Sequence, residues 1–242
     1  MDHAKYSLHA DQLLPLLGTH QTPQLIDIRL PEDIADDPYR LPTAQHVPHR
    51  NIIAQLDTLD RTRAVVTICQ KGLKLSHGAA AILRSAGFDA RALEGGSVAW
   101  RGNGNTVVAL DAAPACGTPW VLPATHDRRA ALRAWVIRRW FDPDAPLLWV
   151  PVQHVDAVAH RFDAHAFADD TPLAPACAAR GLSDPSLLAY VASIDTGQAP
   201  GTAWIDMLPN LHKTDEELAD AALAVLDAAW AAHRHHTGQE AA

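Results

Sequence analysis

One cysteine of this 242-residue chain stands where nucleophilic chemistry is expected. Cys69 follows the apolar, β-branched run 65–68 and precedes a short loop that contains glycine and lysine. A strand that ends in cysteine and reverses into a helix places the sulfur above the loop's backbone N–H groups, at the positive end of the helix dipole. Such surroundings favour the thiolate, which is the reactive form of cysteine. The pattern therefore predicts that Cys69 is a nucleophile.

The loop after Cys69 supplies the candidate substrate-binding residues. They are Gln70, Lys71, Gly72, Leu73, Lys74, Leu75 and Ser76. Lys71 and Lys74 add positive charge that favours an anionic substrate. Gly72 permits a backbone conformation that a side chain resists, and Ser76 fits the N-cap of the following helix. The alternative is that Cys69 is a buried structural thiol in front of a solvated turn.

Short apolar strands alternate with helices around the cysteine. Strands are expected at 24–29, 44–48, 65–69 and 90–93, and helices at 8–17, 76–86 and 96–101. This alternation is typical of an α/β fold, a parallel sheet with helices on both faces. Asp27 and Arg29 at the end of the first strand are interpreted as a structural pair, with contact to substrate as the alternative.

Residues 5–103 resemble a rhodanese domain, because four motifs occur in that family's order and spacing. The motifs are Asp27-x-Arg29, Ala44-x-His46-Val47-Pro48, the Cys69 loop, and the segment 93–100. The resemblance implies a rhodanese-like parallel sheet and a sulfurtransferase in which Cys69 takes a sulfane sulfur from thiosulfate or a persulfide donor. Cys69 then passes the sulfur to a thiol or cyanide acceptor, and no cofactor is implied.

The loop departs from the family pattern in length and charge. The segment from Cys69 to Leu75 is one residue longer than is usual among relatives. In the same superfamily this longer loop is associated with dual-specificity phosphatases and arsenate reductases, whose wider ring holds a tetrahedral oxyanion. Those phosphatases close the ring with arginine, and Leu75 holds that place here, so phosphoryl transfer lacks the cation it needs. Binding of a larger oxyanion stays open as an alternative.

Composition limits the remaining classes of function. The formal net charge of -8 at pH 7 argues against nucleic acid and acidic membranes as partners. No apolar run approaches the ~20 residues of a membrane helix, and the first residues lack the form of a signal peptide. Three scattered cysteines suit neither a disulfide framework nor a metal site. We therefore expect a cytoplasmic protein without metal, whose partners are a small-molecule sulfur donor and a thiol acceptor. The oligomeric state stays open.

The second half of the chain differs in character from the first. Residues 105–126, rich in Gly, Ala, Pro and Thr, are predicted to link a rhodanese-like domain over 1–104 to a mainly α-helical domain over 127–242. The run 133–145 resembles the signature that opens the C-terminal domain of chromate-resistance proteins of the ChrB type. The similarity extends, in degenerate form, over residues 128–232.

Two arginines within that resemblance are candidates for binding an anion. Arg138 and Arg139 are predicted to hold an oxyanion such as chromate or sulfate, or to contact nucleic acid, with a solvated or salt-bridged helix face as the alternative. Two functions follow from the whole sequence. The first is a rhodanese-type sulfurtransferase with catalytic Cys69, linked to chromate or oxyanion stress. The second is a non-catalytic oxyanion sensor or regulator.

Overall fold

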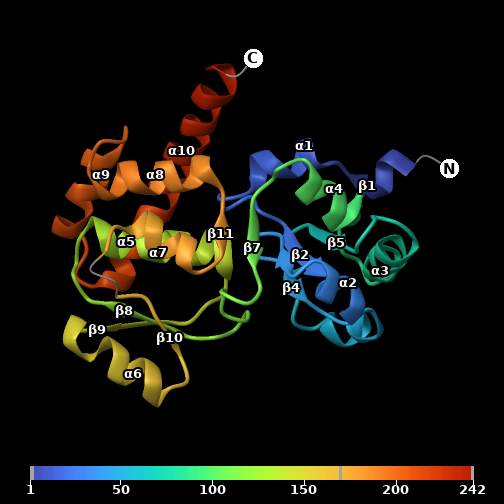
Figure 1. Ribbon diagram of the computed structural model, residues 1–242, viewed down its shortest axis with the longest axis horizontal. Helices are drawn as coiled ribbons and strands as arrows, with labels where there is room; N and C mark the ends of the chain where they lie inside the picture. The colour runs from blue at the N-terminus through green and yellow to red at the C-terminus, as the bar shows by residue number, and fades with distance from the viewer. Residues whose placement is uncertain (1–2, 169–170, 241–242) are drawn as a thin grey trace. The chain divides into compact units, whose positions relative to one another are not determined.

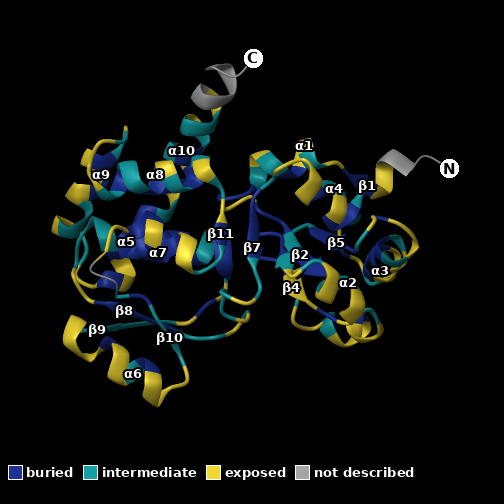
Figure 2. Ribbon diagram, viewed as in Figure 1, coloured by how far each residue is buried: buried dark blue, intermediate teal, exposed yellow. Residues whose placement is uncertain are grey.

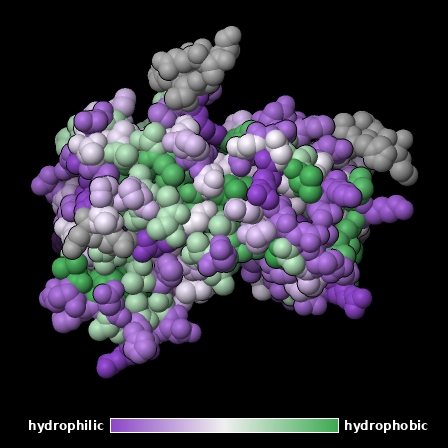
Figure 3. Space-filling model, viewed as in Figure 1, coloured by the Kyte–Doolittle hydropathy of each residue, from purple (hydrophilic) through white to green (hydrophobic). Residues whose placement is uncertain are grey.

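The computed structural model describes residues 3–168 and 171–240, and the chain divides into two compact units. The first unit comprises residues 1–17 and 21–111, and the second comprises residues 18–20 and 112–242. Buried residues are concentrated in the strands and on the inner helix faces of each unit (Figure 2), and hydrophilic residues cover much of the surface visible in Figure 3. No helix in the described part of the chain is both long and apolar enough to cross a membrane.

The first unit is built on a five-stranded parallel sheet (Figure 1). In spatial order the strands are β1 (Ser7–Leu8), β6 (Ala90–Leu93), β5 (Val65–Ile68), β2 (Gln24–Asp27) and β4 (Gln45–His46). Parallel ladders join β5 to both β6 and β2, and every residue of β5 is buried. A parallel strand that is covered on both faces is expected to be a continuous apolar run. The strand before Cys69 is thus the centre of the sheet.

Helices surround this sheet, as the alternation of elements predicted (Figure 1). They are α1 (Ala10–Leu13), α2 (Pro31–Asp36), α3 (Lys74–Ser85) and α4 (Gly96–Gly102), with 3-10 turns at His3–Tyr6, Leu14–Leu16 and His49–Gln55. Helix α3 contributes Ala79, Ala80 and Leu83 to an apolar core that also contains Ile26 and Val65 of the sheet. The α/β class predicted for this half is confirmed.

The segment predicted as a linker contains regular structure. Residues 105–126 include β7 (Val107–Ala109), which pairs antiparallel with β3 (Tyr39–Arg40) inside the first unit. They also include β8 (Trp120–Pro123) of the second unit. Each strand is short and lies among Gly, Pro and Ala, so neither stands out from the surrounding composition. These strands correct the expectation that the whole segment is a linker.

The second unit is mainly helical, as predicted, and it also holds a small parallel sheet. Its helices are α5 (Arg128–Val136), α6 (Val155–Arg161), α7 (Leu173–Ala179), α8 (Pro185–Asp195), α9 (Thr202–Met207) and α10 (Asp215–Glu240), with a π-helical turn at Ile137–Phe141 and 3-10 turns at Val152–His154 and Leu208–Asn210. The sheet has the order β10 (His165–Ala166), β8, β9 (Leu147–Val150), and β11 (Leu182–Ser183) is a further short strand.

An aromatic cluster forms the core between the helices of the second unit. The rings of Trp135 and Trp140 meet edge to face with 6.1 Å between centroids. Tyr190 of α8 contacts Trp135, and Trp230 of α10 contacts both Trp140 and Tyr190. Large rings in such edge contacts bury much apolar area, so this cluster joins α5, α8 and α10.

Candidate active site

Cys69 directly follows β5 and is almost fully buried. Only 5% of the residue is exposed, and its Sγ lies 3.2 Å from the Oγ of Ser76. The Ser76 hydroxyl donates its hydrogen to the carbonyl oxygen of Leu73 at 3.0 Å. A hydroxyl has one hydrogen to donate, so the Cys69 thiol is the donor toward Ser76 in this arrangement. The sulfur therefore has a polar partner inside the protein.

The loop after Cys69 presents backbone donors that the protein itself does not use. It runs from Cys69 to Leu73, and α3 begins at Lys74. Within residues 3–168 and 171–240, the backbone N–H groups of residues 70–75 have no hydrogen-bond acceptor. Unpaired N–H groups at a helix start carry partial positive charge and are suited to an anion. The backbone thus offers donors for negative charge next to Cys69.

Ser76 lies inside the first turn of α3 and does not cap it, which corrects the prediction. The N-cap position is held by Leu73. The Ser76 side chain points inward to Cys69. The backbone carbonyl oxygen of Ser76 accepts a hydrogen bond from Thr67 Oγ1 at 2.8 Å. A capping serine needs a non-helical backbone at the helix boundary, whereas Ser76 already has helical backbone.

The first turn of α4 holds the cysteine loop by its carbonyl groups. The Ser97 N–H donates to the Cys69 carbonyl oxygen, and the Val98 N–H donates to the Gln70 carbonyl oxygen, both at 3.0 Å. The orientation of these peptide groups is therefore fixed by a helix that follows later in the chain. This contact was not predicted, since the segment 93–100 contributed only to the resemblance. The sequence feature that could have indicated this contact is the glycine pair 95–96 at the start of a helix.

Two glycines allow this close approach. Gly72 and Gly96 have φ of 66° and 61°, in the left-handed region. A Cβ on Gly72 would lie 2.5 Å from the Leu93 carbonyl oxygen, and a Cβ on Gly96 would collide with the Cys69 carbonyl oxygen. Only glycine fits either position, so the predicted need for conformational freedom at Gly72 is confirmed.

The side chains of the loop divide into exposed and packed groups. Lys71, Leu73 and Lys74 are exposed, and Leu73 is 61% exposed. Leu75 packs against the apolar core beneath α3. Gln70 is half-buried and lines a surface hollow of about 470 Å³. The other residues of the hollow are Asp36, Asp37, Val98, Arg101 and Gly102. The two lysine ammonium groups thus add positive charge at the surface of the loop.

Asp27 and Arg29 form a buried ion pair at the end of β2, the strand next to β5. The Arg29 Nη2 lies 2.7 Å from Asp27 Oδ2, and the Arg29 Nε donates to the same oxygen at 2.9 Å. Arg29 also donates to the carbonyl oxygens of Asp37 and Tyr39. Its side chain has no exposed surface, so it does not meet a substrate from solvent. The interpretation as a structural pair is confirmed.

Arg138 and Arg139, predicted as an anion site, are paired with acidic side chains of α10. Arg138 contacts the carboxylate of Asp220. Arg139 donates from Nε and Nη2 to the two carboxylate oxygens of Asp227 at 2.9 and 3.0 Å, and Asp227 also accepts from Trp135 Nε1. These contacts tie α5 and its π-helical turn to α10. They correct the prediction of an anion site in favour of the salt-bridged alternative.

The structure also bears on metal binding. Among residues 3–168 and 171–240, no group of three or more His, Cys, Asp or Glu side chains is placed to hold a metal ion.

Comparisons with known proteins agree on the first unit. The model of the rhodanese-like domain family matches residues 9–103. The "Putative sulfurtransferase YtwF" of Bacillus subtilis is 35% identical over 78 residues, which are 32% of this chain and 73% of that protein.

Solved structures include similar chains. A rhodanese-related protein from Thermoplasma volcanium is 22% identical with a TM-score of 0.37, over 43% of this chain and 97% of that one. A rhodanese-like domain protein from Staphylococcus aureus is 27% identical with a TM-score of 0.36, over 39% of this chain and 90% of that one. With the family match and the Bacillus relative together, this chain belongs to the rhodanese-like family through its residues 9–103.

Proposed function

We propose that this protein is a sulfurtransferase that carries a sulfane sulfur on Cys69. The observation that carries the proposal is the position of the Cys69 Sγ after the central strand, beside the loop of residues 70–75. The N–H groups of that loop have no acceptor in the described part of the chain. Fixed donors of this kind stabilise negative charge on a thiolate and on a persulfide alike. Family membership supports the class of reaction, and the loop geometry supports the residue.

In the first half-reaction the Cys69 thiolate attacks the outer sulfur of thiosulfate or of a persulfide donor. The thiol proton has been lost to solvent by then. A bond forms between Sγ and the outer sulfur, and the bond from that sulfur to the rest of the donor breaks. With thiosulfate the leaving group is sulfite, which takes the electron pair. Lys71 and Lys74 attract the anionic donor, and the loop N–H groups hold the charge as it moves outward by one sulfur.

In the second half-reaction the outer sulfur of the Cys69 persulfide is attacked by an acceptor. Cyanide becomes thiocyanate, and a thiolate becomes a persulfide. In both cases the sulfur–sulfur bond breaks and its electron pair returns to Sγ, which restores the Cys69 thiolate. No oxidant or reductant enters the cycle. The loop donors serve both states, because the negative charge moves by only one sulfur–sulfur bond between the thiolate and the persulfide.

Mass spectrometry of the intact protein tests this proposal. Thiosulfate is expected to add one sulfur atom to the wild type and none to Cys69→Ser, and cyanide is expected to remove the adduct as thiocyanate. Cys116→Ser is the matched control, since Cys116 lies in the second unit and is partly exposed. It should keep the adduct. An adduct that persists in Cys69→Ser, or a wild type that accepts sulfur neither from thiosulfate nor from glutathione persulfide, contradicts the proposal.

A non-catalytic oxyanion sensor or regulator is the second candidate, and the same N–H groups favour it. It predicts that chromate or sulfate raises the melting temperature and that this effect survives Cys69→Ser. Because Arg138 and Arg139 are paired with acidic side chains, the loop is its main support. The resemblance of residues 128–232 to chromate-resistance proteins, and with it the link to chromate stress, stays a prediction. Unchanged melting with either anion would remove this candidate.

A further inference from the structure

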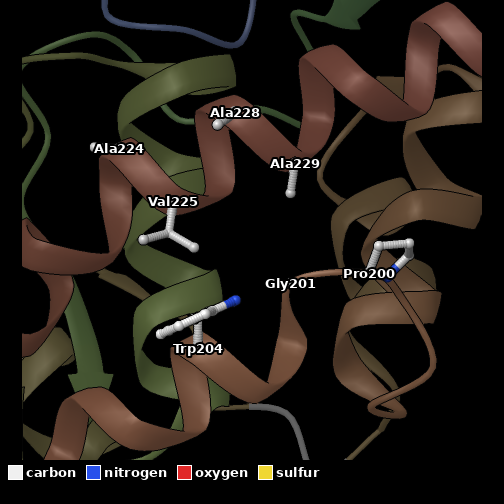
Figure 4. A pocket seen from close by; sticks show the side chains of 7 residues that line it. All are labelled: Pro200, Gly201, Trp204, Ala224, Val225, Ala228 and Ala229. Carbon is white, nitrogen blue, oxygen red and sulfur yellow. The ribbon is translucent and has the colours of Figure 1, made fainter.

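A surface groove in the second unit lies between α9 and α10. Its lining contains no charged residue and consists of Pro200, Gly201, Trp204, Ala224, Val225, Ala228 and Ala229. The groove has a volume of about 630 Å³. Figure 4 shows the Val225 side chain pointing toward the Trp204 indole, with Pro200 across from Ala229. Almost the whole wall of the groove is therefore hydrocarbon.

Further large apolar side chains are exposed on α9 and the turn that follows it. Trp204, Met207 and Leu211 are 67%, 56% and 74% exposed. Their spacing of three and four residues places them along one side of this helical segment. We call the groove together with Met207 and Leu211 the α9–α10 face. Several large apolar side chains exposed on one helical segment are suited to contact with another macromolecule.

Charges along α10 are separated by sign. Exposed acidic residues, Glu216, Glu217 and Asp220, stand in its first turns, and His233, Arg234 and His235 follow toward its other end. Between these groups, residues 221–232 carry one ionisable side chain, Asp227, which is buried and paired with Arg139. The helix therefore has an acidic end, an apolar middle, and an end that carries the half-buried Arg234 and two histidines.

We propose that the α9–α10 face binds the same face of a second copy of this chain, with the two α10 helices antiparallel. Antiparallel pairing sets the acidic end of each helix against the end of the other that carries Arg234 and the histidines, whereas parallel pairing brings the two acidic ends together. A two-fold axis makes such a contact self-complementary. Ala224 and Ala228 are exposed at the middle of α10, where their small side chains allow close approach, and Trp204 and Met207 cover the flanks.

Light scattering coupled to size exclusion tests this pairing on the full chain. At tens of micromolar the wild type is expected to have twice the monomer mass of 26.1 kDa. Ala228→Glu puts a charge at the centre of the face and is expected to give a monomer. Ala157→Glu is the matched control, because Ala157 is an exposed alanine of α6 outside the face, and it should stay dimeric. Circular dichroism checks that both variants fold. A monomeric wild type, or a dimer that Ala228→Glu leaves intact, overturns the proposal.

Charge reversal tests the antiparallel orientation. Glu216→Lys and His235→Glu each change an exposed end of α10, and each is expected to weaken the dimer several-fold. The double variant is expected to regain the lost affinity, since the two introduced charges are opposite in sign and face each other across the antiparallel contact. High salt should reduce all three effects by screening. A double variant weaker than both single variants contradicts antiparallel pairing. The outcome is independent of sulfur transfer, which the same variants should leave unchanged.

Discussion

The Sγ of Cys69 and the Oγ of Ser76 lie 3.2 Å apart, and the Ser76 hydroxyl also reaches the Leu73 carbonyl oxygen at 3.0 Å. When Cys69 is a thiol, the Ser76 oxygen accepts the hydrogen of the thiol, and the Ser76 hydroxyl donates its own hydrogen to the Leu73 carbonyl oxygen. Once the sulfur loses its proton, rotation of the hydroxyl lets the same hydrogen donate to the thiolate. Ser76 is therefore a partner for both protonation states of the proposed nucleophile.

Ser76→Ala is expected to slow alkylation of Cys69 by iodoacetamide at neutral pH about tenfold, because a hydrogen bond to a charged group contributes roughly 1.5 kcal/mol or more. Persulfide formation from thiosulfate should slow by a similar factor. Ser85→Ala is the control on the same helix, since Ser85 bonds to the Ala81 carbonyl oxygen on the exposed side of α3. Equal alkylation rates for Ser76→Ala and wild type would rule out this role.

Gly72→Ala is expected to destabilise the first unit by at least ~1 kcal/mol, because the new Cβ meets backbone atoms of Leu93, Gly95 and Gly96 and the φ is left-handed. Persulfide formation should fall with it, as the loop carbonyls lose their place on α4. Gly78→Ala is the opposite case, since Gly78 lies inside α3 with open space around it, and it should stabilise by about 0.5–1 kcal/mol. Denaturant melts of both variants measure the two effects, and a Gly72→Ala protein of wild-type stability would contradict the first.

Lys71→Gln and Lys74→Gln are each expected to raise the KM for thiosulfate a few-fold, because both ammonium groups are exposed and attract the donor through solvent. The rate of sulfur transfer from the loaded protein to cyanide should change less. The KM effect should shrink as salt is added. Lys213→Gln, on the second unit, is the control. A KM that the loop variants leave unchanged at low salt would show that the lysines do not steer the donor.

Asp27→Asn is expected to destabilise the first unit by roughly 3 kcal/mol, because the buried Arg29 guanidinium loses its 2.7 Å partner and keeps only the Asp37 carboxylate at 3.8 Å. The exposed pair of Asp89 and Arg91, at 3.2 Å, offers the matched contrast. Asp89→Asn should cost at most ~1 kcal/mol, because surface pairs are weakened by solvent. Urea denaturation monitored in the first unit separates the two cases, and similar losses in both variants would refute the buried-pair account.

Tyr190 is expected to make the free energy of unfolding of the second unit fall at alkaline pH. Burial, with the negative charge of Asp227 adding to it, raises the pKa of the Tyr190 phenol. Above about pH 10 the unfolded chain loses the phenol proton that the folded chain keeps, so the free energy of unfolding falls as pH rises. Tyr190→Phe also loses the hydrogen bond to the Leu226 carbonyl oxygen. The variant should be less stable by about 1 kcal/mol at neutral pH.

The stability gap between Tyr190→Phe and wild type should close as the pH rises toward about 11, because phenylalanine does not ionise. Thermal melts of both proteins across this range measure the gap, and Tyr39→Phe is the control in the first unit. A gap that widens with pH would contradict the raised pKa.

Local patterns were enough to predict the strand, loop and helix around Cys69. The run 65–68 is apolar because β5 is covered on both faces, and Gly72 stands where the chain needs a left-handed residue. The prediction that Ser76 caps α3 was wrong, because spacing in the sequence does not distinguish a capping hydroxyl from one that points into the protein. The hydrogen bonds from Ser97 and Val98 to the cysteine loop were not predicted, because they join residues that are distant in the chain.

Errors in the second half have the same physical origin. Arg138 and Arg139 look like an anion site in sequence because their partners, Asp220 and Asp227, lie on a helix far along the chain. Strand β8 was not predicted within the linker because it is short. It is stabilised by pairing with β9 and β10, which lie further along the chain. The mainly α-helical character of residues 127–242 was predictable because an amphipathic pattern repeats over several helical turns.

The bonds from Ser97 and Val98 to the carbonyls of Cys69 and Gln70 make the reactive loop a product of the whole first unit. Cys69 and α4 are separated along the chain by α3 and β6. A fragment that ends before α4 therefore contains the cysteine but lacks the N–H groups that orient the Cys69 and Gln70 peptides. The sulfur-carrying role proposed for Cys69 therefore requires the whole first unit to be folded, because α4 sets the loop geometry on which that role depends.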